Sequence, residues 1–391
     1  MKALVWFSSG DVRMVEVPVP DITEPNDVVV KVTGTTICGS DLHIFHGELM
    51  TMQKGDIIGH EFMGVVDCVG PNVTNLKVGQ RVVSSCQIAC GECRYCKQKL
   101  SSFCERTNDS SLMNAMGFPG GQAEYVKVPY GNVNLLPIPD EVPDEKALYL
   151  SDVLPTSYHC VVNTEVKEGD VVAIWGLGPI GQCAARWAQL KGAKRVIGID
   201  SHPQRLAFAA NKSGIETINF KEHKDVPARL LELVPGGVDV ALDCGTFREP
   251  KTFTHKVEKT LMLETDVPET ANEMITSVKK MGRCGIISDY FGNVNHFAIG
   301  ALMEKGVRFI GHGQSPVHKY WEEILNDYII PGKFDPTFMI THRVPIDDMA
   351  KLYVAFDKRI DGVEKVFVET KFSKPPSKGC PATTRVDDWA K

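Results

Sequence analysis

The stretch VVAIWGLGPIG, residues 171–181, decides the fold of this chain. Its first five residues predict a buried strand, and a helix is expected to begin directly after the glycines. Such a turn lets the backbone approach a pyrophosphate, while the helix N-terminus supplies amide donors and a partial positive charge. The stretch therefore predicts a dinucleotide-binding turn, and a glycine turn without a ligand is the alternative. The candidate binding residues are Gly176, Gly178, Pro179, Ile180 and Gly181.

Strands and helices alternate after this turn. The expected helix ends near Gly192, and a strand at 196–200, a helix at 203–213 and a strand at 238–243 follow. This alternation predicts a doubly wound parallel sheet. The apolar face of the first helix is formed by Ile180, Ala184, Trp187 and Ala188.

Asp200 ends the second of these strands, about 20 residues after the glycine turn. A carboxylate at this place accepts hydrogen bonds from the adenosine ribose and repels a 2′-phosphate. It therefore favours NAD over NADP. Arg205 is close enough in sequence to keep NADP open as the alternative.

The part of the chain before this sheet has a different pattern. Short β-type runs at 28–32, 64–70 and 79–83 are separated by glycine and proline. They predict an all-β body that resembles a barrel or a sandwich. From about residue 305 the pattern returns to mixed short elements, and the stretch 374–379 (KPPSKG) is expected to be extended or mobile.

Four cysteines form the most specific metal motif. They are separated by two, two and seven residues, and thiolates with this spacing can converge on one tetrahedral cation. A set of four cysteines indicates a closed, structural zinc site, which performs no chemistry. Its ligands are Cys90, Cys93, Cys96 and Cys104.

Composition excludes several classes of protein. The formal net charge of −6 over 391 residues argues against a dedicated nucleic-acid binder. No apolar run reaches the roughly 18–20 residues that span a bilayer, and the N-terminal apolar run is too short for a signal peptide. Twelve cysteines without a secretory signal favour metal ligation and reduced thiols over disulfides. We therefore expect a cytoplasmic protein that binds neither nucleic acid nor membranes.

Cys38 and His60 are candidate ligands of a second, open metal site in the β-rich part. A thiolate and an imidazole suit catalytic zinc, which keeps three protein ligands and one exchangeable position. Spacing alone does not connect these two residues. A small buried cysteine and a structural histidine are the alternatives.

These motifs together resemble the zinc-dependent medium-chain dehydrogenase/reductase family. The matching segments are CGSD at 38–41, GHE at 59–61, the cysteine motif and the glycine turn, which occur in the family's order and cover nearly the whole chain. The resemblance implies a GroES-like β-barrel catalytic domain with an inserted Rossmann domain. The expected boundaries are 1–160 for the first part of the catalytic domain, 161–304 for the Rossmann domain, and 305–391 for the return to the catalytic domain and the C-terminal tail.

Within the family, the chain resembles most the glutathione-independent formaldehyde dehydrogenase and formaldehyde dismutase branch. The segment LSDVLPTSYH at 150–159 has Asp152 where many members have a second cysteine ligand. A long charged insertion at 247–266 is a further marker, as are residues 295–306 and 313–317. In this branch the insertion is associated with covering the adenosine end of a tightly held NAD. A solvated charged segment is the alternative.

The resemblance also implies roles for individual residues. The catalytic zinc would be held by Cys38, His60 and Asp152. Ser40 would bond to the substrate oxygen, and His43 would exchange the proton with water through the cofactor ribose. A helix cap and a surface histidine are the respective alternatives. Asp41 would fix the tautomer of His60. Two weaker assignments are Glu61 approaching the metal during substrate exchange and Thr156 lying against the nicotinamide.

The sequence thus predicts an enzyme with two zinc ions per chain. It would transfer a hydride between NAD(H) and a small-molecule alcohol, aldehyde or aldehyde hydrate. An aldehyde dismutase with tightly held NAD is one alternative, and a non-catalytic dinucleotide-binding protein is another. Family habit suggests a homodimer or homotetramer.

Overall fold

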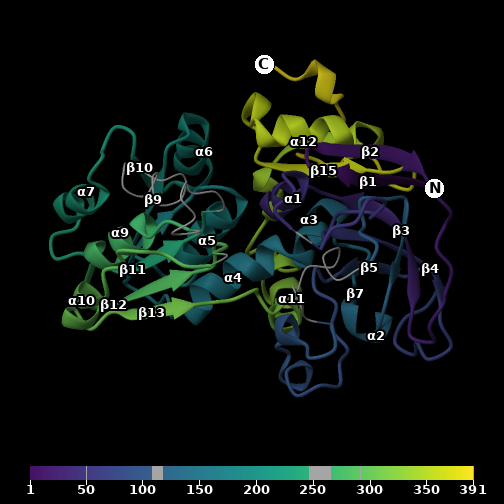
Figure 1. The fold of residues 1–391 in the computed structure, drawn as a ribbon, viewed down its shortest axis with the longest axis horizontal. Coiled ribbons are helices and arrows are strands. Elements are labelled where there is room, and N and C mark those ends of the chain that lie inside the picture. Colours follow the sequence, from purple (N-terminus) through teal and green to yellow (C-terminus); the bar gives the residue numbers. More distant parts are fainter. Residues whose placement is uncertain (50, 108–117, 246–265, 291, 391) are drawn as a thin grey trace. The chain divides into compact units, whose positions relative to one another are not determined.

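The computed structural model describes the chain except residues 50, 108–117, 246–265, 291 and 391 (Figure 1). Contacts divide the chain into two compact units. Unit 1 contains residues 1–155 and 314–391, and unit 2 contains residues 156–313. Unit 1 is therefore discontinuous in sequence, and unit 2 is inserted into it.

Unit 2 is built on a six-stranded parallel sheet with the order β10-β9-β8-β11-β12-β13. The chain enters at the central strand β8 and builds outward first on one side and then on the other, as in doubly wound sheets. Pairing of β13 with β12 keeps residues after 304 in this unit, so the observed boundary comes later than the expected one. The strands are β8 (Val171–Trp175), β9 (Arg195–Asp200), β10 (Glu216–Asn219), β11 (Val238–Asp243), β12 (Val278–Ile286) and β13 (Arg308–Gly311).

Helices connect these strands. The apolar face expected for α5 is confirmed at Ala184, Trp187 and Ala188, which are fully buried, while Ile180 is partly exposed. Proline at the first turns of α5 and α6 suits positions whose amide has no partner within the helix. The helices are α4 (Val153–Asn163), which crosses the unit boundary, α5 (Pro179–Leu190), α6 (Pro203–Ser213), α7 (Val226–Leu233), α9 (Glu269–Ser277) and α10 (Ile299–Glu304).

Unit 1 contains a seven-stranded sheet and a separate hairpin of β1 and β2. The sheet has the order β14-β15-β3-β4-β5-β7, and β6 pairs with β3. The end of the chain thus joins its beginning, since Val368 pairs with Thr35. The strands are β1 (Lys2–Ser8), β2 (Asp11–Glu16), β3 (Val28–Thr35), β4 (Phe62–Val69), β5 (Arg81–Ser84), β6 (Tyr125–Val128), β7 (Leu135–Pro137), β14 (Ile340–Pro345) and β15 (Lys365–Glu369).

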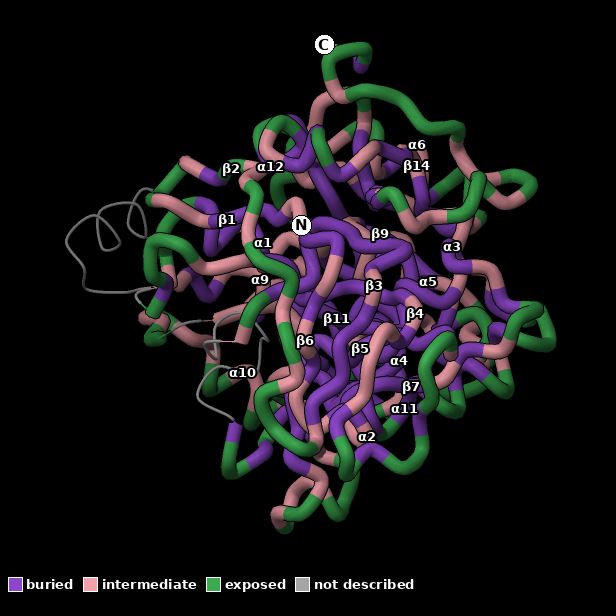
Figure 2. The backbone as a smooth tube through the Cα atoms, turned by 90° about the vertical axis from the view of Figure 1, so that its right-hand side faces the viewer, coloured by how far each residue is buried: buried purple, intermediate pink, exposed green. Residues whose placement is uncertain are grey.

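The core of unit 1 is formed by β-branched and aromatic side chains on these strands. Val28, Val30 and Val32 of β3 pack with Phe62 and Val66 of β4 in one buried cluster, and buried stretches are drawn purple in Figure 2. Among the described residues, no helix is long and apolar enough to cross a membrane. The helices of unit 1 are α1 (Gly39–Phe45), α2 (Gly131–Asn134), α3 (Asp144–Ala147), α11 (Val317–Glu323) and α12 (Met349–Asp357).

The stretch 374–379, expected to be extended or mobile, is tied to the core by a buried arginine. Arg343 is 1% exposed and donates to Glu145 at 2.6 Å, to Glu369 at 2.8 Å and to the carbonyl of Lys374 at 2.6 Å. Ser377 donates its amide and hydroxyl to the two oxygens of Glu145 at 3.0 and 2.8 Å. Sequence composition alone did not reveal this clamp, because its partners lie far apart along the chain.

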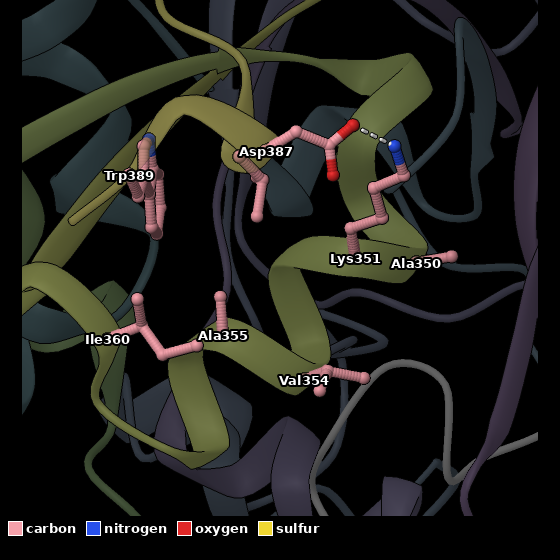
Figure 3. A pocket seen from close by; sticks show the side chains of 8 residues that line it. Ala350, Lys351, Val354, Ala355, Ile360, Asp387 and Trp389 are labelled. Carbon is pink, nitrogen blue, oxygen red and sulfur yellow. Dashed lines mark hydrogen bonds and ion pairs between the residues drawn. The ribbon is translucent and has the colours of Figure 1, made fainter. Parts of the chain in front are cut away.

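The last described turn packs on α12 beside a shallow groove (Figure 3). Trp389 is buried, and its ring centroid lies 4.1 Å from that of His342. Asp387 pairs with Lys351 on α12, and Ile360 closes the other side of the groove. None of the residues expected to bind zinc or cofactor lines this groove.

Replacing Arg343 with Met is expected to lower the stability of unit 1 by about 3–5 kcal/mol, because it leaves the Glu145 carboxylate buried without its cation. Differential scanning calorimetry measures the effect. The control is Arg13→Met, which breaks the exposed ion pair with Asp11 at 2.7 Å and should leave the stability nearly unchanged, because water screens such pairs. Equal losses in the two variants would contradict a special role for the clamp.

The clamp also has a defined pH dependence. Burial acts to raise the pKa of Glu145, but bonds from Ser377 and Arg343 outweigh it and hold the pKa below its ordinary value of 4.5. The stabilisation is therefore complete above pH 4.5 and is lost as the pH falls through the lowered pKa.

Candidate active site

Four side chains from separate parts of unit 1 converge on one point. The donor atoms of Cys38, His60, Glu61 and Asp152 all lie within 4.8 Å of one another. Cys38 precedes α1, His60 and Glu61 precede β4, and Asp152 lies between a 3-10 helix and α4. The structure thus brings together the three expected ligands, with Glu61 as a fourth neighbour.

The start of α1 positions the cysteine. Cys38 has extended backbone angles and occupies the N-cap, and its amide donates to Asp41 Oδ2 at 2.9 Å. Asp41 therefore plays the part of the acidic residue in a capping box. Ser40 lies inside the first turn and not at the cap, and its Oγ is 3.9 Å from Cys38 Sγ. Ser40 therefore does not cap the helix, and its hydroxyl lies beside the sulfur of Cys38.

The surroundings of His60 suit a metal ion. Its Nδ1 lies 3.2 Å from Asp41 Oδ1 and its Nε2 lies 3.4 Å from Asp152 Oδ2, with the ring fully buried. Nε2 has no aligned hydrogen bond to any described residue. If Nδ1 carries the proton toward Asp41, the Nε2 lone pair faces a carboxylate and a thiol. A cation between them would remove that repulsion.

The charge at this site supports the same reading. Burial acts to lower the pKa of His60, but Asp41 and Asp152 outweigh it and raise the pKa well above 6.5. The carboxylates thus favour positive charge at the centre of the group. A thiolate, an imidazole and a carboxylate are ligands that zinc accepts.

Glu61 is held by a buried lysine that sequence reasoning missed. Lys365 Nζ lies 2.6 Å from Glu61 Oε1, and both side chains are 1% exposed. Burial acts to raise the pKa of Glu61, and Lys365 opposes this effect. The lysine also donates to the carbonyl of Ile37 at 3.1 Å. The available signal was a lysine at the start of β15, directly before the apolar run VFV.

A second missed residue is Gln122. Its Nε2 donates to Asp41 Oδ2 at 3.3 Å, and its Oε1 accepts from the hydroxyl of Tyr353 at 2.9 Å. Gly59 has φ +100°, and a Cβ there would lie 2.2 Å from Gln122 Cγ. Glycine before His60 is therefore required by both the backbone angle and the close packing.

The four-cysteine motif forms a second cluster, separate from the first. The four sulfurs lie within 4.8 Å of one another. Backbone amides point at them: those of Cys90, Glu92 and Cys96 donate to the sulfurs of Cys104, Cys90 and Cys93 at 3.4, 3.5 and 3.5 Å. Such bonds stabilise thiolates. Cys86 belongs to neither cluster of described residues.

Burial acts to raise the pKa of Cys104, but hydrogen bonds from Thr107 and from backbone amides outweigh it and lower the pKa to about 6. A thiolate at neutral pH is the form that binds metal. No carboxylate or histidine joins this group in the part of the chain that the structure describes. The arrangement fits a closed structural site.

The glycine turn of unit 2 connects β8 to α5. Gly176 has φ +87°, and a Cβ on Gly181 would lie 1.9 Å from the carbonyl oxygen of Gly176. Gly178 is the N-cap of α5, and Pro179 and Ile180 begin the helix. A side chain at Gly176 or Gly181 would therefore push the turn apart, which is the constraint that a dinucleotide turn imposes.

Asp200 and Arg205 both lie at this turn. Asp200 accepts from the amides of Leu177 at 2.8 Å and Ser201 at 2.6 Å. The Arg205 guanidinium lies 3.6 Å from the place of a Cβ on Gly178. Thr156 lies in α4. The insertion expected at 247–266 falls outside the described residues except for its last residue.

Comparison with known proteins agrees with this geometry. Residues 24–140 match the family described as "Alcohol dehydrogenase GroES-like domain", and residues 179–260 match "Zinc-binding dehydrogenase". A zinc-type alcohol dehydrogenase-like protein of Schizosaccharomyces pombe is 43% identical over 94% of this chain and 91% of its own length.

Two further proteins are similar to the chain over most of its length. The formaldehyde dismutase of Pseudomonas putida is 33% identical over 91% of this chain and 95% of its own. The structure of alcohol dehydrogenase TADH from Thermus sp. ATN1 superposes with a TM-score of 0.82, at 30% identity, over 95% of this chain and all of the other. On these matches, the chain belongs to the zinc-dependent medium-chain dehydrogenase/reductase family.

Proposed function

We propose that Cys38, His60 and Asp152 hold the catalytic zinc of an enzyme that transfers a hydride between NAD(H) and an alcohol or aldehyde. The observation that carries this assignment is the convergence of the donor atoms of Cys38, His60 and Asp152 within 4.8 Å of one another, while His60 Nε2 makes no hydrogen bond to a described residue. Family membership supplies the reaction class and the use of zinc and NAD. The ligand set and the roles below are the proposal.

Bound zinc supplies Lewis-acid polarisation of the substrate oxygen, and the nicotinamide accepts or gives the hydride. The residues of the chain then perform the remaining tasks. Asp41 holds the His60 ring through Nδ1. Ser40 hydrogen-bonds the substrate hydroxyl from the first turn of α1, and His43, one turn further on, exchanges the proton with water through the cofactor ribose.

Glu61 has a supporting role in this scheme. Its pairing with Lys365 keeps one carboxylate oxygen engaged, while His60 Nε2 lies 4.0 Å from that same oxygen. We propose that Glu61 approaches the metal while substrate exchanges and that Lys365 limits this movement. Gly176, Gly178, Pro179, Ile180, Gly181, Asp200, Arg205 and Thr156 are proposed to bind NAD.

The substrate is proposed to be formaldehyde hydrate, another small aldehyde or a larger alcohol, since the walls of a pocket and not its zinc ligands set specificity. An assay of aldehydes and alcohols with and without glutathione distinguishes these. Turnover without added NAD after extensive dialysis would indicate dismutation. We further propose a cytoplasmic homodimer or homotetramer. The absence of disulfides among the twelve cysteines supports a reducing compartment.

Replacing Cys38 with Ser is expected to remove one of two zinc ions per chain and to lower kcat by on the order of a thousandfold, since Lewis-acid stabilisation contributes several kcal/mol. Metal analysis and steady-state kinetics measure both effects. Cys68→Ser, at a half-buried cysteine of β4 outside both clusters, is the control. Unchanged turnover in Cys38→Ser would defeat the assignment.

Cys93→Ser tests the structural cluster. We expect it to lose the other zinc ion and to lower the melting temperature, because an open cluster no longer holds the loop together. The calorimetric trace shows this. Loss of activity with unchanged melting would instead place catalysis in this cluster.

Asp200→Asn tests cofactor choice. Removing the charge that repels a 2′-phosphate is expected to raise the ratio of kcat/KM for NADP over NAD by about 10- to 100-fold, since a hydrogen bond to a charged group contributes about 1.5–3 kcal/mol. Asp225→Asn, at the N-cap of α7 in the same unit, should leave the ratio unchanged. If Asp200→Asn does not change this ratio, Asp200 does not set the choice between NAD and NADP, and Arg205 becomes the candidate.

A further inference from the structure

The C-terminal end of α1 folds back on His43. Gly47 has φ +75°, and its amide donates to the carbonyl of Ile44 at 3.0 Å. The amide of Glu48 donates to the carbonyl of His43 at 2.9 Å. These two bonds are those of a Schellman motif, in which glycine at the left-handed position reverses the chain. The motif places the backbone of Glu48 against the residue that takes the substrate proton.

The side chains of these two residues also meet. A Glu48 carboxylate oxygen contacts His43 Nδ1. The His43 side chain is 7% exposed, whereas the Glu48 side chain is 50% exposed. The pair therefore joins a buried imidazole to solvent across a single contact.

A neighbouring pair shows what an ordinary contact of this kind looks like. His46, on the same turn, contacts Asp357 of α12 at 3.0 Å, with side chains 37% and 33% exposed. Both partners of that pair already reach water, so neither needs the other to exchange a proton. His43 differs because its ring is buried and its Nδ1 faces a carboxylate that is not.

We propose that Glu48 is the proton exit of the active site. In alcohol oxidation the hydride leaves the substrate carbon for NAD⁺, and the hydroxyl proton passes by way of Ser40 and the cofactor ribose to His43 Nε2. The proton on His43 Nδ1 then moves to the Glu48 carboxylate, which releases it to water. One proton leaves per hydride transferred, and His43 is left neutral with its proton on Nε2. Proton exchange with water then restores the Nδ1–H tautomer before the next turnover. Aldehyde reduction runs the same transfers backward.

This inference rests on the role of His43 in the proposed function. It adds a positioning residue that acts through His43 and does not touch substrate. The carboxylate fixes the Nδ1–H tautomer, which leaves Nε2 free of a proton and able to accept one. Without the carboxylate, proton release from a buried ring depends on water or buffer reaching it.

Glu48→Gln keeps the size of the side chain and removes its proton acceptor. In stopped-flow alcohol oxidation with a pH indicator, we expect proton release to slow by about tenfold or more, a modest share of a general acid–base contribution. The KM for the alcohol should stay the same. Added imidazole or phosphate buffer should restore the rate in proportion to its concentration, and Glu48→Asp should retain part of it. Asp357→Asn, which breaks the exposed pair of His46, is the matched control and should show neither the slowing nor the rescue.

The outcomes separate this inference from the proposed function. If His43→Asn slows turnover while Glu48→Gln releases protons at the normal rate, the exit is wrong and the relay stands. If His43→Asn also has no effect, the relay itself is wrong. If proton release is slow in Glu48→Gln and added buffer does not restore it, Glu48 is only a structural contact of His43. That result would overturn the inference. If Glu48→Gln lowers the melting temperature, Glu48→Asp replaces it in the test. Slower proton release in Glu48→Asp that added buffer restores supports the inference, and slower release that buffer does not restore overturns it.

Discussion

The catalytic unit is organised around negative charge that is buried in one place. Asp41, Glu61 and Asp152 are almost inaccessible to water and surround one imidazole beside the Cys38 sulfur. Buried carboxylates are tolerated only when a cation is close. Lys365 supplies one positive charge, and a divalent metal held as proposed would supply the rest. In that case the fold must hold these groups in place before the metal binds.

Hydrogen bonds between buried side chains hold these groups in place. The three proposed ligands come from three stretches of chain, and a series of contacts supports the first of them: Asp41 holds the Cys38 amide, Gln122 holds Asp41, and Tyr353 holds Gln122. Pairing of β15 with β3 brings the lysine to Glu61. Because buried residues hold these side chains through successive hydrogen bonds, a substitution on the surface should move the proposed ligands little.

Much of this could be predicted from the sequence, and the exceptions share a cause. The strands at 171–175 and 238–243 and the helix at 203–213 have the expected bounds, because apolar runs and proline or glycine signals are local. The cysteine motif was equally readable, since its ligands are near neighbours. Lys365, Gln122 and the Arg343 clamp were not, because each acts on residues that are remote in sequence and leaves no periodic pattern. Glu48 is a different case. Glycine at position 47 is a local signal for the end of a helix, but only the structure shows that the turn brings the Glu48 side chain to His43.

The pairing of Thr35 with Val368 also has a consequence for biosynthesis. The ribosome releases β3 and β4 long before β15 exists, so the first 155 residues must wait with an incomplete sheet. Unit 2 is contiguous and can fold during that interval, since domains fold as units in the order of synthesis. The strand edge of β3 that awaits β15 is then open to other chains. The exposure ends when β15, whose Glu369 accepts from Arg343, pairs with β3.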